Sequence, residues 1–138
     1  MLFCEFWIPD AVYREVTVAG LGLSGANTLA DTRWMEHVCT APKPDPLLIA
    51  ELDRGGAAVI SLARIRLPCL TVIDEKRGRR IARHVYGLAV KGTAGLLVEA
   101  RRRGLLDNLR TTLLDLQRAG YYLSDAVIAA ACKADEGE

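Results

Sequence analysis

The chain has 138 residues, of which 51% are hydrophobic and 25% are charged. This composition suits a single globular domain over residues 1–138 with a core of its own, and it argues against a disordered chain. The 18 basic residues nearly balance the 17 acidic ones, so the net charge of +1 does not by itself indicate a partner. The basic residues are unevenly placed. From Arg64 to Arg103, eleven basic residues stand against three acidic ones, which gives this segment a charge of +8 and leaves −7 for the rest.

Several classes of protein are not expected for this sequence. No apolar run approaches the roughly 20 residues of a membrane-spanning helix, so no membrane partner is expected. The N-terminus has neither the basic segment nor the small-residue cleavage site of a secretory signal. The four cysteines lie far apart without a CxxC pair, which argues against a zinc site and a disulfide framework. We therefore expect a cytoplasmic protein with free thiols.

The first third of the chain predicts a strand, a helix and a break. Residues 2–8 are apolar and aromatic and precede a proline, which is typical of a strand. A helix is expected from Asp10, and the glycine-rich residues 19–27 are expected to form a loop. Residues 34–38 predict a short helical face, which ends before the three prolines of residues 41–46.

The middle of the chain predicts helices and a buried strand. Residues 47–49 and 57–63 show helical spacing, with Gly55 and Gly56 between them. Each glycine in a helix interior costs about 0.5–1 kcal/mol relative to alanine. Either the second helix begins after this pair, or another feature fixes the turn. Residues 69–73 are apolar and rich in β-branched side chains, which predicts a strand buried on both faces.

The remaining elements complete an alternating pattern. Residues 79–86 predict a helix closed by Gly87, and residues 88–90 predict a second short strand. Strands that alternate with helices predict an α/β fold with parallel strands. Three amphipathic helices follow. They run from a Thr93 cap to Gly104, from an Asp107 cap to Gly120, and from a Ser124 cap to a polar tail, residues 135–138, that is expected to fray.

The residues that indicate chemistry follow the strand over 69–73. In open parallel sheets, ligands bind beyond the carboxyl ends of the strands, where Asp74 and Glu75 lie. A carboxylate there suits Mg²⁺ or Mn²⁺, because hard cations prefer oxygen ligands. The basic residues that follow suit a nucleic-acid backbone; alternatively, Asp74 caps the next helix and they form a solvated face. These basic residues are Lys76, Arg77, Arg79 and Arg80.

A second candidate site is the segment Gly92-Thr93-Ala94-Gly95. It resembles a phosphate cradle, in which backbone amides open a helix and a hydroxyl is available. The segment lacks the full P-loop pattern, and a tight turn from strand to helix needs the same residue types. Both interpretations of Thr93 stay open on the residues alone.

The order of several segments is specific to one family. The most specific is ID-E-x-R-G-R-R at residues 73–80 followed by G-T-x-G-x-L at residues 92–97. Around this pair stand IPDAVYREV, LDRGGAAVISLA, VEARRRGLL and LLDLQRAGYYLS. Over nearly the whole chain, this order resembles PIN-domain-like proteins, which are predicted nucleic-acid-binding relatives of the toxin ribonucleases of toxin–antitoxin pairs.

The resemblance implies a fold and a chemistry. The implied fold is a Rossmann-like PIN fold, an α/β fold with a mostly parallel sheet flanked by helices. The implied chemistry is hydrolysis of single-stranded RNA by an acidic cluster that holds Mg²⁺ or Mn²⁺. By position, Asp74 matches a metal-binding catalytic acid, Thr93 matches a hydroxyl residue that lines the pocket, and Glu75 is a possible auxiliary. RNA and an antitoxin protein are the implied partners.

Two departures from the family pattern reduce this acidic cluster. The pattern L-D-x-G-E-A has Glu where this chain has Gly56, and the chain starts at what resembles the second strand, without the metal-binding Asp of the first. Mg²⁺ gives up hydration only for well-placed anionic oxygens, so we expect a weakly active or inactive ribonuclease. The alternative is a non-catalytic module that binds nucleic acid or protein. Strands left without that neighbour have unpaired edges, which predicts a homodimer.

Overall fold

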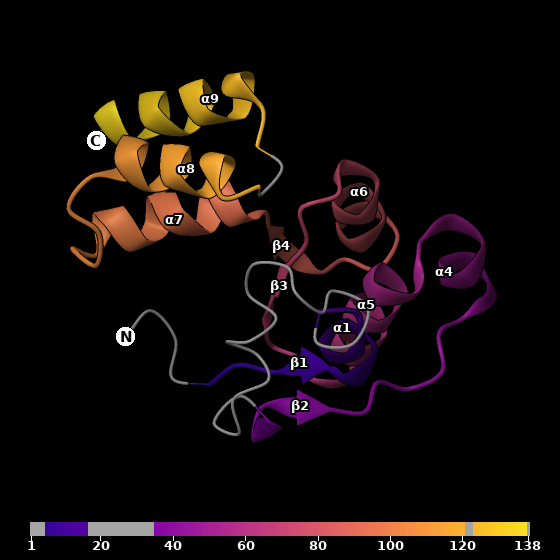
Figure 1. Cartoon of the computed structure of the whole chain (residues 1–138). Helices are drawn as coiled ribbons and strands as arrows, with labels where there is room; N and C mark the ends of the chain where they lie inside the picture. Colours follow the sequence, from indigo (N-terminus) through magenta and orange to yellow (C-terminus); the bar gives the residue numbers. More distant parts are fainter. Residues whose placement is uncertain (1–4, 17–34, 121–122, 138) are drawn as a thin grey trace. The chain divides into compact units, whose positions relative to one another are not determined.

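Residues 5–16, 35–120 and 123–137 are described by the computed structural model (Figure 1). They belong to two compact units, which are described separately below. The N-terminal unit is Glu5–Val90, and the described part of the C-terminal unit starts at Lys91. The predicted loop over residues 19–27 lies outside the described residues, as do the first residues of the predicted strand over 2–8.

The N-terminal unit begins with two short parallel strands. β1 (Ile8–Pro9) pairs with β2 (Val38–Cys39), with Ile8 opposite Val38. In the described part of residues 2–8, only Ile8 is therefore in a strand, so the observed strand is much shorter than predicted. The helix predicted for the segment of β2 is wrong there, because its backbone pairs with β1 instead.

A carboxylate joins the ends of these two strands. Helix α1 (Asp10–Arg14) follows β1 directly, as predicted. The Asp10 side chain accepts hydrogen bonds from the backbone N–H of Ala11 at 3.0 Å and of Ala41 at 3.5 Å. Because Ala41 follows β2 and Asp10 follows β1, this carboxylate holds the two carboxyl ends together.

Aspartate caps fix the starts of the next two helices. Asp45 caps α4 (Pro46–Glu51), and its side chain accepts a hydrogen bond from the N–H of Leu48 at 3.2 Å. Asp53 caps α5 (Arg54–Ile65) and accepts a hydrogen bond from the N–H of Gly56 at 2.8 Å. The glycine pair therefore lies inside the first turn of α5, where the Asp53 cap is the feature that fixes the turn.

A strand pair and a helix complete the N-terminal unit. β3 (Leu70–Val72) pairs with β4 (Ala89–Lys91), and α6 (Lys76–His84) lies between them in the sequence. The expectation that β3 is buried on both faces is wrong, because Val72 is 41% exposed while Thr71 is buried. Gly87 has a φ of +65°, and it ends the turn after α6 as predicted.

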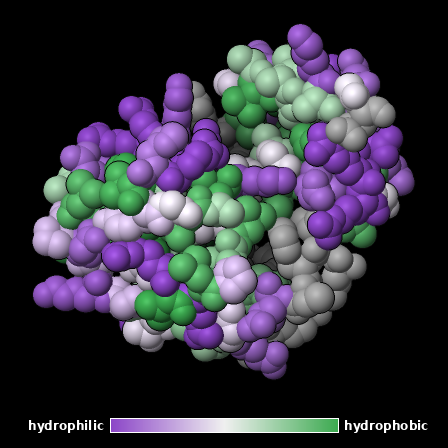
Figure 2. Space-filling view, turned by 180° about the vertical axis from the view of Figure 1, so that it is seen from behind, coloured by the Kyte–Doolittle hydropathy of each residue, from purple (hydrophilic) through white to green (hydrophobic). Residues whose placement is uncertain are grey.

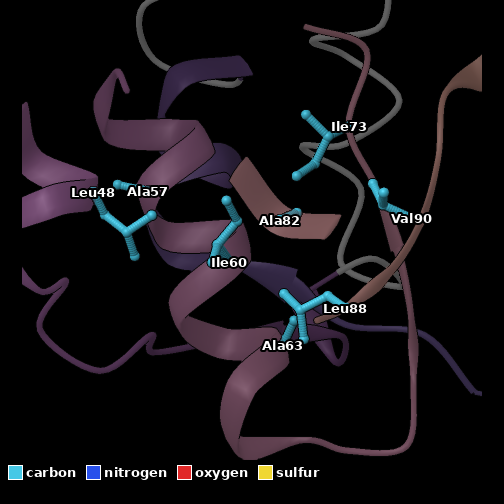
Figure 3. Close-up of a cluster of buried hydrophobic side chains, with 8 residues drawn as sticks. All are labelled: Leu48, Ala57, Ile60, Ala63, Ile73, Ala82, Leu88 and Val90. Carbon is cyan, nitrogen blue, oxygen red and sulfur yellow. The ribbon is translucent and has the colours of Figure 1, made fainter. Parts of the chain in front are cut away.

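The core of this unit holds α5 against the β3–β4 pair and α6 (Figure 3). Gly78 lets α6 approach closely, because a Cβ built there would lie 2.9 Å from Cγ2 of Ile73. The position of α6, and of its charged side chains, is therefore set by buried contacts. The buried members of this core are Leu48, Ala57, Ile60, Ala63, Ile73, Ala82, Leu88 and Val90.

The C-terminal unit consists, in its described residues, of three helices (Figure 1). They are α7 (Thr93–Arg102), α8 (Leu109–Arg118) and α9 (Asp125–Glu136). Their apolar faces pack together, as the helical spacing of the sequence predicts. The buried members of their core are Val98, Leu109, Leu113, Leu123, Ile128, Ala131 and Cys132.

The helix boundaries of this unit agree with the predictions at one cap and differ at two. Ser124 caps α9 through a hydrogen bond from the N–H of Val127 to its side chain at 3.1 Å, as predicted. The cap of α8 is Asn108 rather than Asp107, and the cap of α7 is Gly92, which makes Thr93 the first helical residue. The tail prediction is wrong for residues 135–136, because α9 continues through them.

The described residues are rich in helix and carry short strands, which agrees with an α/β fold. The strands form two two-stranded sheets within this part of the chain, and β1 and β2 run parallel. None of the helices in the described ranges is both long enough and apolar enough to cross a membrane.

Candidate nucleic-acid interface

The predicted site residues Asp74 and Glu75 lie between β3 and α6. Asp74 is exposed and follows the buried Ile73 by one residue. The N-cap position of α6 falls on Glu75, whose side chain makes no capping hydrogen bond, and not on Asp74. The alternative in which Asp74 occupies the cap position is therefore wrong. The Asp74 carboxylate lies at the carboxyl end of a strand, where the sequence predicts ligand chemistry.

Two of the four predicted nucleic-acid contacts have partners inside the protein. Nη1 of Arg79 donates to the carbonyl oxygen of Ile73 at 3.1 Å and to that of Asp74. This guanidinium therefore fixes the end of β3. Arg77 forms an ion pair with the carboxylate of Glu51, at the end of α4. Both arginines bind α6 to neighbouring elements, a role that their position in a basic run does not reveal.

The outer side of α6 carries the other basic residues. Helical spacing places Lys76, Arg80, Arg83 and His84 on one side of this helix, and all four are exposed. We call these four residues the α6 cationic face. Arg83 donates from Nη2 to the carbonyl oxygen of Val90 at 3.4 Å. The side chains of Lys76, Arg80 and His84 have no hydrogen bond or ion pair with any part of the chain that the structure describes.

A network of polar side chains holds the turn after α6. The hydroxyl of Tyr86 donates to the Asp45 carboxylate at 2.7 Å, and Nη1 of Arg64 approaches the same carboxylate at 3.1 Å. The Tyr86 hydrogen bond lowers the pKa of Asp45, and the contacts with Leu48 and Arg64 act in the same direction against desolvation. Burial and the nearby Asp45 carboxylate raise the pKa of the Tyr86 hydroxyl. This network holds the C-terminal end of α6 beside α4 and α5.

Comparison with known families identifies the family of this chain. The family model DUF3368, described as a PIN domain, matches residues 1–136. The chain belongs to this PIN-domain family. The predicted family and the α/β class of fold are thereby confirmed. No curated protein and no solved structure matches the chain.

PIN domains generally use divalent metals, and the donor groups in the described residues of this PIN domain are not gathered to hold one. Within the ranges 5–16, 35–120 and 123–137, no three His, Cys, Asp or Glu side chains are grouped to hold a metal ion. Gly56, which the resemblance matches to the family glutamate, lies in the first turn of α5. A Cβ built there would lie 3.1 Å from Oδ1 of Asp53, which already caps the helix.

The predicted site residues of this PIN domain fall in different parts of the chain. Asp74, Glu75 and the basic residues belong to the N-terminal unit, whereas Thr93 begins α7 in the C-terminal unit. A common site for Asp74 and Thr93 therefore stays a prediction. Arg83 and His84 were not predicted as site residues. The spacing of four residues from Lys76 to Arg80 to His84 is the signal that would have identified His84.

Proposed function

We propose that this PIN domain binds single-stranded RNA through the α6 cationic face and cleaves it weakly or not at all. The observation that carries the proposal is a contrast within one unit. Exposed cations are gathered on α6, whereas the carboxylates of the described residues are not gathered into a metal site. Its ancestry is then that of a toxin-type ribonuclease that used Mg²⁺ or Mn²⁺, with Asp74 as the remaining metal-binding acid and Glu75 as an auxiliary.

Binding of this kind is mainly electrostatic. Lys76 and Arg80 lack intramolecular partners among the described residues, so contact with phosphates breaks no ion pair that holds the fold. Each phosphate neutralised on a single strand lowers the slope of log K against log salt by about 0.7. Contacts to phosphates carry no sequence information, so little base preference is expected from this face.

The weak cleavage follows from the site chemistry. Phosphodiester hydrolysis needs charge stabilisation at the scissile phosphate, and a metal ion supplies it in metal-dependent nucleases. Mg²⁺ is retained by well-placed carboxylates, and Gly56 contributes none. Without a bound metal ion, the negative charge of the Asp74 carboxylate repels phosphate more than it assists the reaction.

The test compares two double variants of the full chain. Lys76→Ala/Arg80→Ala removes two cations of the α6 cationic face. Arg110→Ala/Lys133→Ala removes an exposed arginine and lysine from the C-terminal unit and serves as the matched control. Binding of a labelled single-stranded RNA is measured by fluorescence anisotropy over a series of salt concentrations. The slope of log K against log salt is expected to be less steep by about 1.4 for the first variant only. Equal affinity and slope for both variants would overturn the proposed interface.

Cleavage is measured separately on the same RNA with Mn²⁺, with a chelator and with Asp74→Ala. The expected result is little cleavage by the native chain above the chelator control. Rapid, chelator-sensitive cleavage that disappears in Asp74→Ala would contradict the proposed loss of activity and leave the binding result standing.

A second candidate function is a protein-binding or assembly module in the cytoplasm, with an antitoxin protein or a second copy of the chain as partner. Large apolar side chains at the surface support it: Ile49 is 60% exposed, and Ile65 and Leu67 are each 62% exposed. Figure 2 shows hydrophobic residues, in green, exposed among hydrophilic ones. Such residues are typical of contact surfaces when they cluster. Light scattering on the purified chain checks the homodimer, and a monomer mass at high concentration would contradict it.

A further inference from the structure

An exposed tryptophan beside β1 is held by an arginine from the end of α5. The guanidinium carbon of Arg66 lies 4.3 Å from the centroid of the Trp7 ring, which is a cation–π contact. Nη2 of Arg66 is 3.3 Å from Sγ of Cys39 in β2, so the guanidinium has a second anchor. Trp7 nevertheless remains 39% exposed. The arginine therefore orients the ring by lying over one of its faces, and part of the tryptophan stays exposed.

A second aromatic pair lies at the same strands. Phe6 precedes Trp7 in the chain, and its ring stacks on His37, which precedes β2, with 3.9 Å between the ring centroids. Both rings of this pair are partly buried. The segment before β1 thus carries two consecutive aromatic residues, each stacked on a polar or cationic side chain from another part of the chain.

We propose that Trp7, oriented by Arg66, is a stacking platform for an unpaired nucleobase of a single-stranded nucleic acid. This inference rests on the proposed function, to which it adds a contact with bases. An aromatic ring beside a guanidinium suits single strands, because a base stacks on the ring while the cation attracts the phosphates. A duplex keeps its bases stacked on one another and offers none to the platform.

The platform and the α6 cationic face lie in the same unit and are linked through α5. Arg64 stacks on Tyr86, just after α6, with its guanidinium carbon 4.7 Å from the ring centroid. Arg66 follows Arg64 by two residues and reaches Trp7. The C-terminal end of α6 and the platform are therefore both held at the C-terminal end of α5. One strand with phosphates on α6 and a base on Trp7 gains from both contacts, as linked sites do.

Tryptophan fluorescence tests the platform directly. Trp34, the other tryptophan, lies outside the described residues, so the variant Trp34→Phe leaves Trp7 as the single reporter. We expect a uridine-rich RNA to quench its emission on binding. An oligomer of the same length with abasic sugars is expected to bind α6 with little quenching. The same measurement is made with a thymidine-rich single-stranded DNA. The strand that binds more tightly shows whether RNA or DNA is the natural ligand.

Affinity supplies the second readout. Trp7→Leu is expected to weaken binding of the uridine-rich strand by about 5- to 100-fold, the range for loss of one stacked base, with an unchanged salt slope. Trp7→Phe keeps a ring and is expected to recover part of the affinity. Thermal melting of both variants shows whether they fold alike.

The outcomes separate the two proposals. If RNA binds with the expected salt dependence but neither quenches Trp7 nor distinguishes Trp7→Leu from Trp7→Phe, the platform is wrong and the α6 interface stands. If binding is lost only in Trp7→Leu while its melting curve is native, the platform is supported. If the native chain binds neither the uridine-rich nor the abasic strand, both proposals fail.

Discussion

At the residue scale, the basic side chains of α6 divide into two kinds that the sequence does not distinguish. Arg77 and Arg79 are held by Glu51 and by the carbonyl groups at the end of β3, while Lys76 and Arg80 are on the outer side. Glu51 is 26 residues from Arg77 in the chain, so no local pattern reveals the pair. Charge alone predicted a basic surface, and tertiary contacts decide which members remain available.

Two glycines in helices offer a matched test of packing. Gly78→Ala is expected to destabilise the chain by about 1–3 kcal/mol, because its new methyl would lie 2.9 Å from the buried Ile73 side chain. Gly95→Ala in α7 is expected to stabilise it by about 0.5–1 kcal/mol, since the new methyl meets only Lys91 side-chain atoms at 3.8 Å or beyond. Denaturant unfolding of both variants checks these signs. A stabilised Gly78→Ala would contradict the packing of α6 on Ile73.

The network at Asp45 makes part of the stability depend on pH. The folded pKa of Asp45 lies below its ordinary value of 3.8, so the stabilisation is present above that value and is lost as the pH falls through the folded pKa. Tyr86→Phe removes the largest cause of the lowered pKa. We expect the difference in melting temperature between the native chain and Tyr86→Phe to be constant near neutral pH and to shrink in acid. A difference that is independent of pH would contradict this role.

At the scale of elements, the ends of helices were predicted better than their starts. Gly87, Gly104 and Gly120 all adopt positive φ after helices that the sequence ended there. The start of α6 was expected three residues later than observed. Gly78 discourages a helix locally, yet it is buried against Ile73, and that contact with another element makes a helix there favourable. The strands over residues 2–8 and 69–73 were predicted too long, because pairing, rather than propensity, decides where a strand ends, whereas the strand over 88–90 has the predicted length.

The unfilled cap of α6 gives a prediction for an element. Glu75 makes no capping hydrogen bond, so Glu75→Ser is expected to stabilise the chain by about 0.5 kcal/mol or more. Asp53→Ala is the opposite case. It removes the 2.8 Å hydrogen bond to Gly56 and is expected to cost about 1 kcal/mol. Thermal unfolding of the two variants measures both effects. If Glu75→Ser lost stability as Asp53→Ala does, the cap of α6 would already be satisfied.

At the scale of the whole molecule, the family and the α/β class could be predicted because the segments of the chain keep the family's order. The candidate site could be predicted only in part. Asp74 was placed correctly at the end of a strand, but spacing cannot tell whether other carboxylates approach it. Gly56 brings no carboxylate, and an oxygen of Asp53 is committed to a helix cap.

At the scale of the whole molecule, we predict how a metal ion affects stability. A ligand that binds only the folded state raises the melting temperature, so Mn²⁺ is expected to leave the melting temperature of the native chain unchanged. Gly56→Glu adds a carboxylate at the family position and is expected to produce a rise with Mn²⁺, which Gly56→Gln, an uncharged control, does not. A clear rise for the native chain would show that its carboxylates do gather around a metal.

The hydrogen bonds from Arg79 to the end of β3 limit which positions of α6 can change in evolution. A substitution at Arg79 would leave two carbonyl oxygens without their donor and loosen the strand that precedes Asp74. The side chains of Lys76 and Arg80 make no such structural hydrogen bonds with the described residues. Ligand preference is therefore free to drift at the outward positions of one short helix, while the inward arginine keeps the scaffold intact.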